Sequence, residues 1–394
     1  MTTEALATTT AVEAALGEAS EGDRISREQA LLLFGHGGLG PLLRAAAFVR
    51  HLSKGSTVTY SKKVFLPLTH LCRDYCGYCT FRADPASDDD PFMTPQEVLE
   101  LAEAGRQAGC KEALFSLGDQ PERVFPEAKK FLRKQGFERT LEYLAAMTQL
   151  VRDEIGLLPH SNPGVMDASD LKHLKESNVS LGLMLETTSL RLRQTRGPHW
   201  KAPDKVPSIR LKTIEEAGRL SIAFTTGILI GIGETVEERV DSLLAIRDLD
   251  ERYGHIQEVI VQPFRAKPET RMADADEPPT DDLLRTLAIA RLIFGGDMNI
   301  QSPPNLLSSD FPVLLEAGMN DWGGISPVTK DFINPEAAWP QISFLKEKTA
   351  AAGFVLRERL AIYPEFSSRP GFVDEHVQPC LQRLQGQNGY ARTE

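Results

Sequence analysis

A chain of 394 residues with 41% hydrophobic and 25% charged residues has the composition of a folded globular protein. Its formal net charge of -11 disfavours a nucleic-acid backbone as partner, and it contains no run of about 18 apolar residues that would predict a membrane span. Five cysteines, three of them crowded together, and no secretory signal predict a cytoplasmic protein without a disulfide framework.

The N-terminal part of the chain precedes any regular alternation of strands and helices. Residues 1–20 contain no aromatic residue and are predicted to form a disordered tail. Ser26 stands three residues before Gln29, which is the spacing of a capping box. We therefore expect residues 21–57 to form a helical extension.

Eight short apolar runs alternate with amphipathic, helix-like stretches over residues 58–326. The runs cover residues 63–69, 112–118, 157–162, 180–186, 223–231, 258–264, 298–302 and 323–326. Thr94 and Thr235 carry N-cap signals before two of the intervening helices. This alternation predicts an α/β fold, a (β/α)8 TIM-type barrel whose active site lies at the carboxyl ends of the strands. We expect residues 327–394 to pack on the barrel as a C-terminal extension, and the acidic segment 82–90 to be a solvated loop.

Three cysteines follow the first predicted strand directly. Cys72, Cys76 and Cys79 have the spacing C-x3-C-x2-C. Three thiolates on a compact loop suit a [4Fe–4S] cluster whose fourth iron stays open. With Tyr78 as its aromatic residue, the segment resembles the C-x3-C-x-Φ-C pattern of the radical S-adenosylmethionine (SAM) superfamily, in which SAM binds the open iron. The alternative is a zinc-stabilised binding protein in which His70 completes a Cys3His site.

Later strand ends resemble the SAM-binding positions of that superfamily. Gly118 and Asp119 stand where its members carry a Gly-Gly-Glu-like turn that binds the methionyl amino group, although the second glycine and the glutamate are absent here. Glu186 ends the fourth predicted strand. The fifth resembles the G-x-I-x-G-x-x-E stretch beside the adenine, at Gly227, Leu229, Gly231 and Glu234. An ordinary turn and a strand-end charge are the alternative interpretations.

Flanking segments narrow the resemblance to FO synthase subunit 1, where FO is 7,8-didemethyl-8-hydroxy-5-deazariboflavin. The segments are 58–69, 261–264, 301–306, 334–340 and, most discriminating, NDWGGISPVT at 320–329. The resemblance implies a lyase that closes the central deazaflavin ring with loss of ammonia. Its substrate would be the adduct that a separate FO synthase subunit 2 makes from tyrosine and 5-amino-6-(ribitylamino)uracil. A low-potential electron donor is implied as well, but neither a nucleic acid nor a membrane.

Polar residues near the ends of late strands are candidates for binding this substrate. They are Gln262, Gln301, Asn305, Asp321, Trp322 and Thr329. Each residue type is equally suited to turn capping or core packing. Within radical SAM chemistry, subunit 2 itself, a menaquinone- or thiazole-pathway synthase and a nucleic-acid-modifying enzyme are the alternatives.

Overall fold

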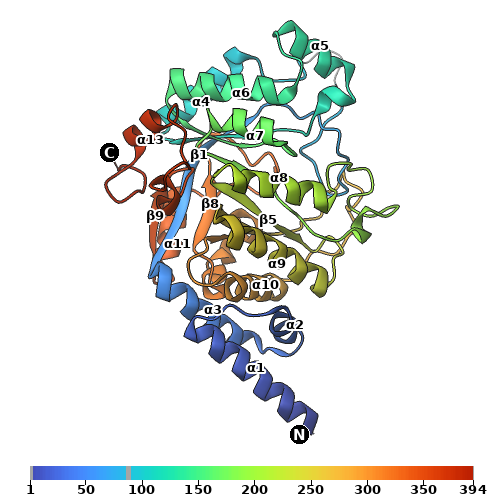
Figure 1. Cartoon of the computed structure of the whole chain (residues 1–394), viewed down its shortest axis with the longest axis vertical. Coiled ribbons are helices and arrows are strands. Elements are labelled where there is room, and N and C mark those ends of the chain that lie inside the picture. The colour runs from blue at the N-terminus through green and yellow to red at the C-terminus, as the bar shows by residue number, and fades with distance from the viewer. Residues whose placement is uncertain (1–2, 86–89, 394) are drawn as a thin grey trace.

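The computed structural model describes residues 3–85 and 90–393, and shows a closed barrel surrounded by helices (Figure 1). Eight parallel strands follow the order β2-β3-β4-β5-β6-β7-β8-β1, and pairing of β1 with β2 closes the ring. The predicted (β/α)8 barrel is therefore confirmed. The strands are β1 Thr57–Pro67, β2 Glu112–Ser116, β3 Leu158–Asn162, β4 Ser180–Gly182, β5 Phe224–Ile230, β6 Ile256–Pro263, β7 Ile300–Gln301 and β8 Asp321–Ile325.

The helices that cover the barrel begin where the sequence signals their caps. Thr94 and Thr235 form capping boxes at the starts of α4 and α9, and Ser26 does so at α2. The helices between the strands are α4 Pro95–Gln107, α5 Pro126–Lys134, α6 Thr140–Leu150, α7 Ala168–Lys175, α8 Pro207–Arg219, α9 Val236–Tyr253 and α10 Thr280–Phe294. Among the described residues, no helix is long and apolar enough to cross a membrane.

The N-terminal segment is helical, so the predicted disordered tail is wrong for its described residues. Helix α1 spans Thr3–Glu21 and contacts α2 (Arg27–His36) and α3 (Leu39–Lys54), which in turn packs on α10. Ala15 and Ala19 of α1 are buried. Alanine has the highest helix propensity, and burial of this small-residue face stabilises a segment whose composition alone resembles a tail.

The C-terminal extension adds a ninth parallel strand at the base of the barrel. Strand β9 (Val355–Arg359) pairs with the first half of β1, at Thr57–Ser61, whereas the second half of β1 pairs with β2. The helices of this extension are α11 Ile342–Ala351, α12 Pro364–Ser367 and α13 Gln378–Leu384. Leu360 and Ile362, which follow β9, are buried in one cluster with Leu158 of β3. The part of the extension from β9 to Ile362 thus closes the end of the barrel opposite the cysteine loop.

Several predicted strands differ in extent: the first, predicted at 63–69, begins six residues earlier at Thr57, and the seventh, predicted at 298–302, is a ladder only over Ile300–Gln301. The predicted strand 180–186 is a ladder only over Ser180–Gly182, and the chain turns at Glu186, where φ is +68°. The predicted strand 323–326 begins two residues earlier, at Asp321. Residues 86–89 of the acidic loop lie outside the described residues.

Candidate active site

A cavity of about 370 Å³ lies inside the barrel, within the size range of small-molecule sites. Residues from each of the strands β1 to β8 line it, and all three cysteines of the predicted cluster loop lie in its wall. It extends down to Glu258 of β6 and to Arg359 of β9. One continuous space therefore joins the cysteine loop to the polar interior of the barrel.

The cysteine loop is fixed by backbone hydrogen bonds to the segment after β2. Gly118 donates its N–H to Thr69 O at 3.0 Å, and Arg73 donates to Asp119 O at 3.1 Å. The Asp119 N–H also donates to Cys72 Sγ at 3.2 Å. Burial raises the pKa of the Cys72 thiol to about 12, so this thiol gives up its proton only when a metal replaces it.

Gly118 is a glycine because the cysteine loop crosses directly over it. A Cβ atom at this position would lie 1.9 Å from Leu71 O and 2.6 Å from Cys72 Cβ. The first of these is a backbone atom, which cannot swing aside as a side chain does. Absence of a side chain at Gly118 is thus a steric condition for the position of Cys72.

The spacing of the ligand atoms separates a cluster from the zinc alternative. A mononuclear tetrahedral zinc holds its thiolates at about 2.3 Å, which places them about 3.8 Å from one another. Among the described residues, three potential ligand atoms lie within 4.8 Å of one another only in a group of three aspartates, and in no set drawn from His70 and the cysteines. His70 Nδ1 instead contacts Phe81 O at 2.8 Å. The free thiols are spread more widely than zinc requires, which fits the larger triangle of a cubane.

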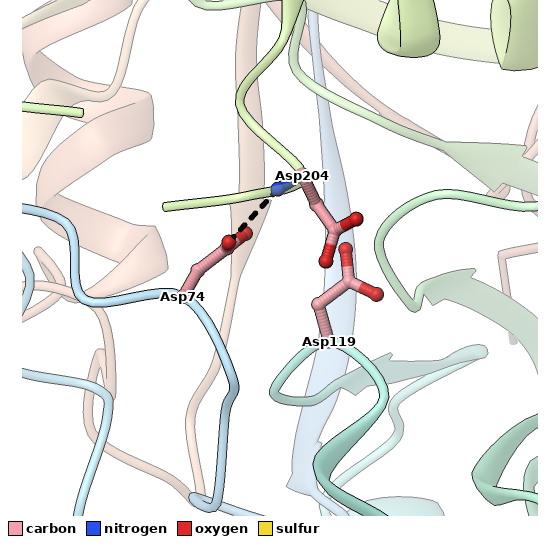
Figure 2. A group of neighbouring side chains, drawn as sticks. All are labelled: Asp74, Asp119 and Asp204. Carbon is pink, nitrogen blue, oxygen red and sulfur yellow. Dashed lines mark hydrogen bonds between the residues drawn. The ribbon is translucent and has the colours of Figure 1, made fainter. Parts of the chain in front are cut away.

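Three aspartates converge beside the cysteine loop (Figure 2). Asp204 donates its N–H to Asp74 Oδ1 at 3.0 Å, and its carboxylate forms an ion pair with Arg73. The Asp119 carboxylate faces that of Asp204; its Oδ2 accepts the Val165 N–H at 3.0 Å, whereas its buried Oδ1 has no partner among the described residues. Burial, and then the charges of Asp204 and Asp74, raise the pKa of Asp119 to about 8. The group is therefore short of positive charge and suited to an ammonium ligand.

Glu186 lies in the wall of the same cavity, within a hydrogen-bonded group. Its Oε2 accepts from the Tyr78 hydroxyl at 3.2 Å, and its Oε1 pairs with the Lys205 ammonium. The Tyr78 hydroxyl also lies 3.0 Å from His199 Nε2. Burial alone would raise the pKa of Glu186, but Lys205 and Arg210 outweigh it and lower the pKa below its usual value. The aromatic residue of the cysteine motif is thereby connected to the fourth strand end.

The four fifth-strand candidates take different places. Leu229 lines the cavity. Gly227 faces β6, where a Cβ would come within 2.1 Å of Ile260 O. Gly231 has φ +86°, and the Glu234 carboxylate accepts its N–H at 2.9 Å, so these two residues form the turn that leads into α9.

Two of the six substrate candidates, Gln262 and Gln301, line the cavity. Thr329 accepts the Phe65 N–H at 3.1 Å through its hydroxyl. Asn305 donates to Asp331 Oδ2 at 3.0 Å. These latter two side chains hold the C-terminal extension against the barrel and do not line the cavity.

Asp321 and Trp322 are buried away from the cavity. The Asp321 carboxylate pairs with Arg359 at 2.7 Å and accepts from the Thr59 hydroxyl. The Trp322 indole donates to Thr349 Oγ1 at 3.1 Å, and the ring is fully buried. Both residues therefore make structural contacts, and neither lines the cavity.

Several cavity residues escaped the sequence analysis. Lys205 and Arg210 follow β4 in a stretch without a recognisable pattern. Trp339 belongs to the C-terminal extension, which folds over the cavity. Lys63 carries a signal that was available, because it stands two residues before Phe65 and therefore faces the same side of the strand.

Comparison with known proteins agrees with this site. The radical SAM superfamily model matches residues 66–246. A 7,8-didemethyl-8-hydroxy-5-deazariboflavin synthase of Methanopyrus kandleri is 51% identical over 335 residues, which are 85% of this chain and 100% of the relative. The chain belongs to this synthase family. Members of the radical SAM superfamily use a [4Fe–4S] cluster and SAM, which are therefore the cofactors of this family member.

Longer relatives and solved structures are also similar. An FO synthase of Streptomyces avermitilis is 48% identical over 369 residues, which are 91% of this chain but 43% of the relative. The present chain therefore spans less than half of that protein. A crystal structure of the methylornithine synthase PylB has a TM-score of 0.68 at 20% identity and covers 87% of this chain and 97% of its own. HydG from Carboxydothermus hydrogenoformans has a TM-score of 0.72 at 17% identity, covering 95% and 89%. These two structures support the fold alone.

Proposed function

We propose that this chain closes the central ring of FO. Its substrate is the adduct of a tyrosine-derived hydroxybenzyl group with 5-amino-6-(ribitylamino)uracil, and ring closure releases ammonia. The observation that carries the proposal is the 51% identity across the whole length of the Methanopyrus kandleri synthase. A cavity that contains the free cysteines and several polar strand residues supports it.

Cys72, Cys76 and Cys79 are the residues that would hold the cluster. When bound, the cluster and SAM supply a carbon-centred radical that removes a hydrogen atom from the substrate. The chain contributes position and protection: Gly118 lets the loop lie close to β2, and the N–H groups of Asp74 and Asp119 point at Cys72 Sγ, at 3.4 and 3.2 Å. Such N–H donors stabilise thiolate charge.

The SAM site would include Asp119 and Glu186, which both line the cavity. The Asp119 carboxylate, with its unpartnered Oδ1, would accept the methionyl ammonium. Glu186, oriented by Tyr78 and Lys205, offers a second carboxylate, and Leu229 an apolar wall for the adenine. Gly227 then keeps the fifth strand close to β6, and Gly231 and Glu234 shape the turn that leads into α9.

The adduct itself would come from a separate FO synthase subunit 2, and electrons from a low-potential donor. We assign the ring-closing half to this chain, because it is similar to the Methanopyrus kandleri synthase over the whole length of that relative.

The test is an anaerobic assay of protein reconstituted with iron and sulfide. It contains SAM, a strong reductant, tyrosine, 5-amino-6-(ribitylamino)uracil and subunit 2, and measures FO by fluorescence and 5′-deoxyadenosine by mass. The parent and a Cys110→Ala control, which loses a buried cysteine outside the cavity, should form both products. The Cys76→Ala variant should form neither.

Each departure from that result has a definite meaning. Deoxyadenosine without FO from the parent would overturn the substrate while retaining radical chemistry. Deoxyadenosine at the parental rate from Cys76→Ala would overturn the cluster ligands. Zinc without sulfide in the purified parent would point to the binding-protein alternative.

A further inference from the structure

Several polar side chains in the cavity wall form no side-chain hydrogen bond with the residues that the structure describes, and three of them lie together beside β8: Lys63, Gln301 and Trp339. Of these three, the Trp339 indole N–H is fully buried. Lys63 is 8% exposed and Gln301 is 6% exposed. Buried polar groups are normally paired, because an unpaired one has lost its hydrogen bonds to water without replacement. An unpaired set that lines one cavity therefore indicates a ligand that completes it.

Two glycines of β8 make room for these side chains. A Cβ at Gly323 would lie 2.2 Å from Gln301 Nε2, and a Cβ at Gly324 would lie 2.7 Å from Lys63 Nζ. Gly323 also has φ +75°, a conformation that side-chain-bearing residues rarely adopt. The paired glycines thus let Gln301 and Lys63 lie over neighbouring residues of one strand, and no side chain from β8 fills the space in front of them.

The Lys63 ammonium is held near the third unpaired donor. It lies 4.9 Å from the centroid of the Trp339 ring, whose Nε1 is buried without a partner among the described residues. No carboxylate among those residues forms an ion pair with Lys63; burial lowers the pKa of its ammonium, and the charges of Glu112 and Asp331 oppose that shift. The cavity wall here offers hydrogen-bond donors from Lys63 and Trp339. The Gln301 amide adds a group that can both donate and accept.

We propose that Lys63 and Gln301, assisted by Trp339, bind the imide edge of the pyrimidinedione ring of the substrate. That edge presents a carbonyl, an N–H and a second carbonyl in a row. The Gln301 amide matches the N–H with its oxygen and one carbonyl with its nitrogen, and the Lys63 ammonium donates to the other carbonyl. This inference rests on the proposed function and identifies which part of the substrate lies under β8.

The test measures binding of the product FO to anaerobically reconstituted protein. FO is fluorescent, so its fluorescence anisotropy reports binding without a label. Two analogues distinguish the oxygens: N3-methyl-FO, which lacks the imide N–H, and 7,8-didemethyl-5-deazariboflavin, which is FO without its 8-hydroxyl group. The parent should bind N3-methyl-FO about tenfold or more weakly than FO, and should tolerate loss of the hydroxyl group. The Lys63→Met variant should bind FO about ten- to hundredfold more weakly than the parent, because it loses one charge-assisted hydrogen bond.

A comparison of variants tests recognition separately from folding. In Gln301→Leu the penalty for N3-methylation should vanish, because the partner of the N–H is gone. Lys62→Met is the matched control, since Lys62 lies on the same strand outside the cavity wall, and it should bind like the parent. Iron and sulfide contents and the thermal midpoint show whether each variant is folded.

The outcomes separate this inference from the proposed function. If the parent forms FO but the N3-methyl penalty persists in Gln301→Leu, or Lys63→Met binds FO like the parent, the imide assignment is wrong and the function stands. A penalty that follows the 8-hydroxyl group, and disappears in Lys63→Met, would replace the imide edge by the phenol oxygen. A parent that neither forms nor binds FO would refute both.

Discussion

Replacement of Gly118 by alanine should prevent cluster assembly while the barrel remains folded. The added Cβ would lie 1.9 Å from Leu71 O, whereas ordinary contacts begin near 3.4 Å, so the loop must retreat by about 1.5 Å, the difference between the two. Functional sites tolerate displacements of about 0.5 Å. Overpacking of this kind costs about 1–3 kcal/mol, which a folded domain survives. The defect should therefore appear at Cys72 before it appears in global stability.

The assay counts iron and sulfide per chain after anaerobic reconstitution, and then measures reductive cleavage of SAM. We expect Gly118→Ala to hold less than half of the parental iron and to form little 5′-deoxyadenosine. Gly35→Ala is the control, since a Cβ there has no neighbour within 4 Å, and alanine should stabilise helix α2 by about 0.5–1 kcal/mol. Parental iron content and parental SAM cleavage in Gly118→Ala would show that close approach of the loop does not control the site.

Three further predictions concern the base of the barrel and its core. Arg359→Met should lower the free energy of unfolding by about 3–5 kcal/mol in denaturant titration, because Asp321 loses its buried partner; a loss below 1 kcal/mol would contradict this. Burial raises the pKa of Glu258 from its usual value of 4.5 to about 7. Between these two pH values the folded state keeps a proton on Glu258 that the unfolded state has released. The free energy of unfolding should therefore fall as pH rises from about 4.5 through 7. Thermal midpoints of Glu258→Gln should show a smaller fall over that range, and equal slopes would refute the assignment. Trp322→Phe should cost about 1 kcal/mol through the lost bond to Thr349 yet keep FO formation, whereas abolished activity in a folded variant would restore Trp322 as a substrate residue.

The barrel and the cysteine loop were predictable because their signals are local. Alternating apolar runs report strands buried on both faces, and the spacing of Cys72, Cys76 and Cys79 lies within one loop. Capping boxes at Thr94 and Thr235 predicted helix starts for the same reason. In each case the residues that decide the structure are adjacent in the chain.

Asp321 and Trp322 show where local signals fail. A strand that begins two residues earlier than expected moves Asp321 to the base of the barrel, where Arg359 from a distant strand neutralises it. Nothing near Asp321 in the sequence reveals that partner. The glycines of the same motif are more informative, because they make room for Gln301 and Lys63.

The prediction of a disordered N-terminal tail failed for a related reason. Its composition is that of a solvated segment, and the helix gains stability from contacts with α2 and α3 that a single sequence does not display.

The position of β9 has a consequence for the order in which the protein is made. Strand β1 leaves the ribosome early, but Thr57–Ser61 gain their β9 neighbour only after residues 355–359 have been synthesised. Until then, that half of β1 has an open edge, the kind of surface at which strands of different chains join. Nascent or C-terminally shortened chains therefore carry an aggregation-prone edge, with Asp321 still lacking its countercharge. The last part of the chain thus protects one of the first strands to appear.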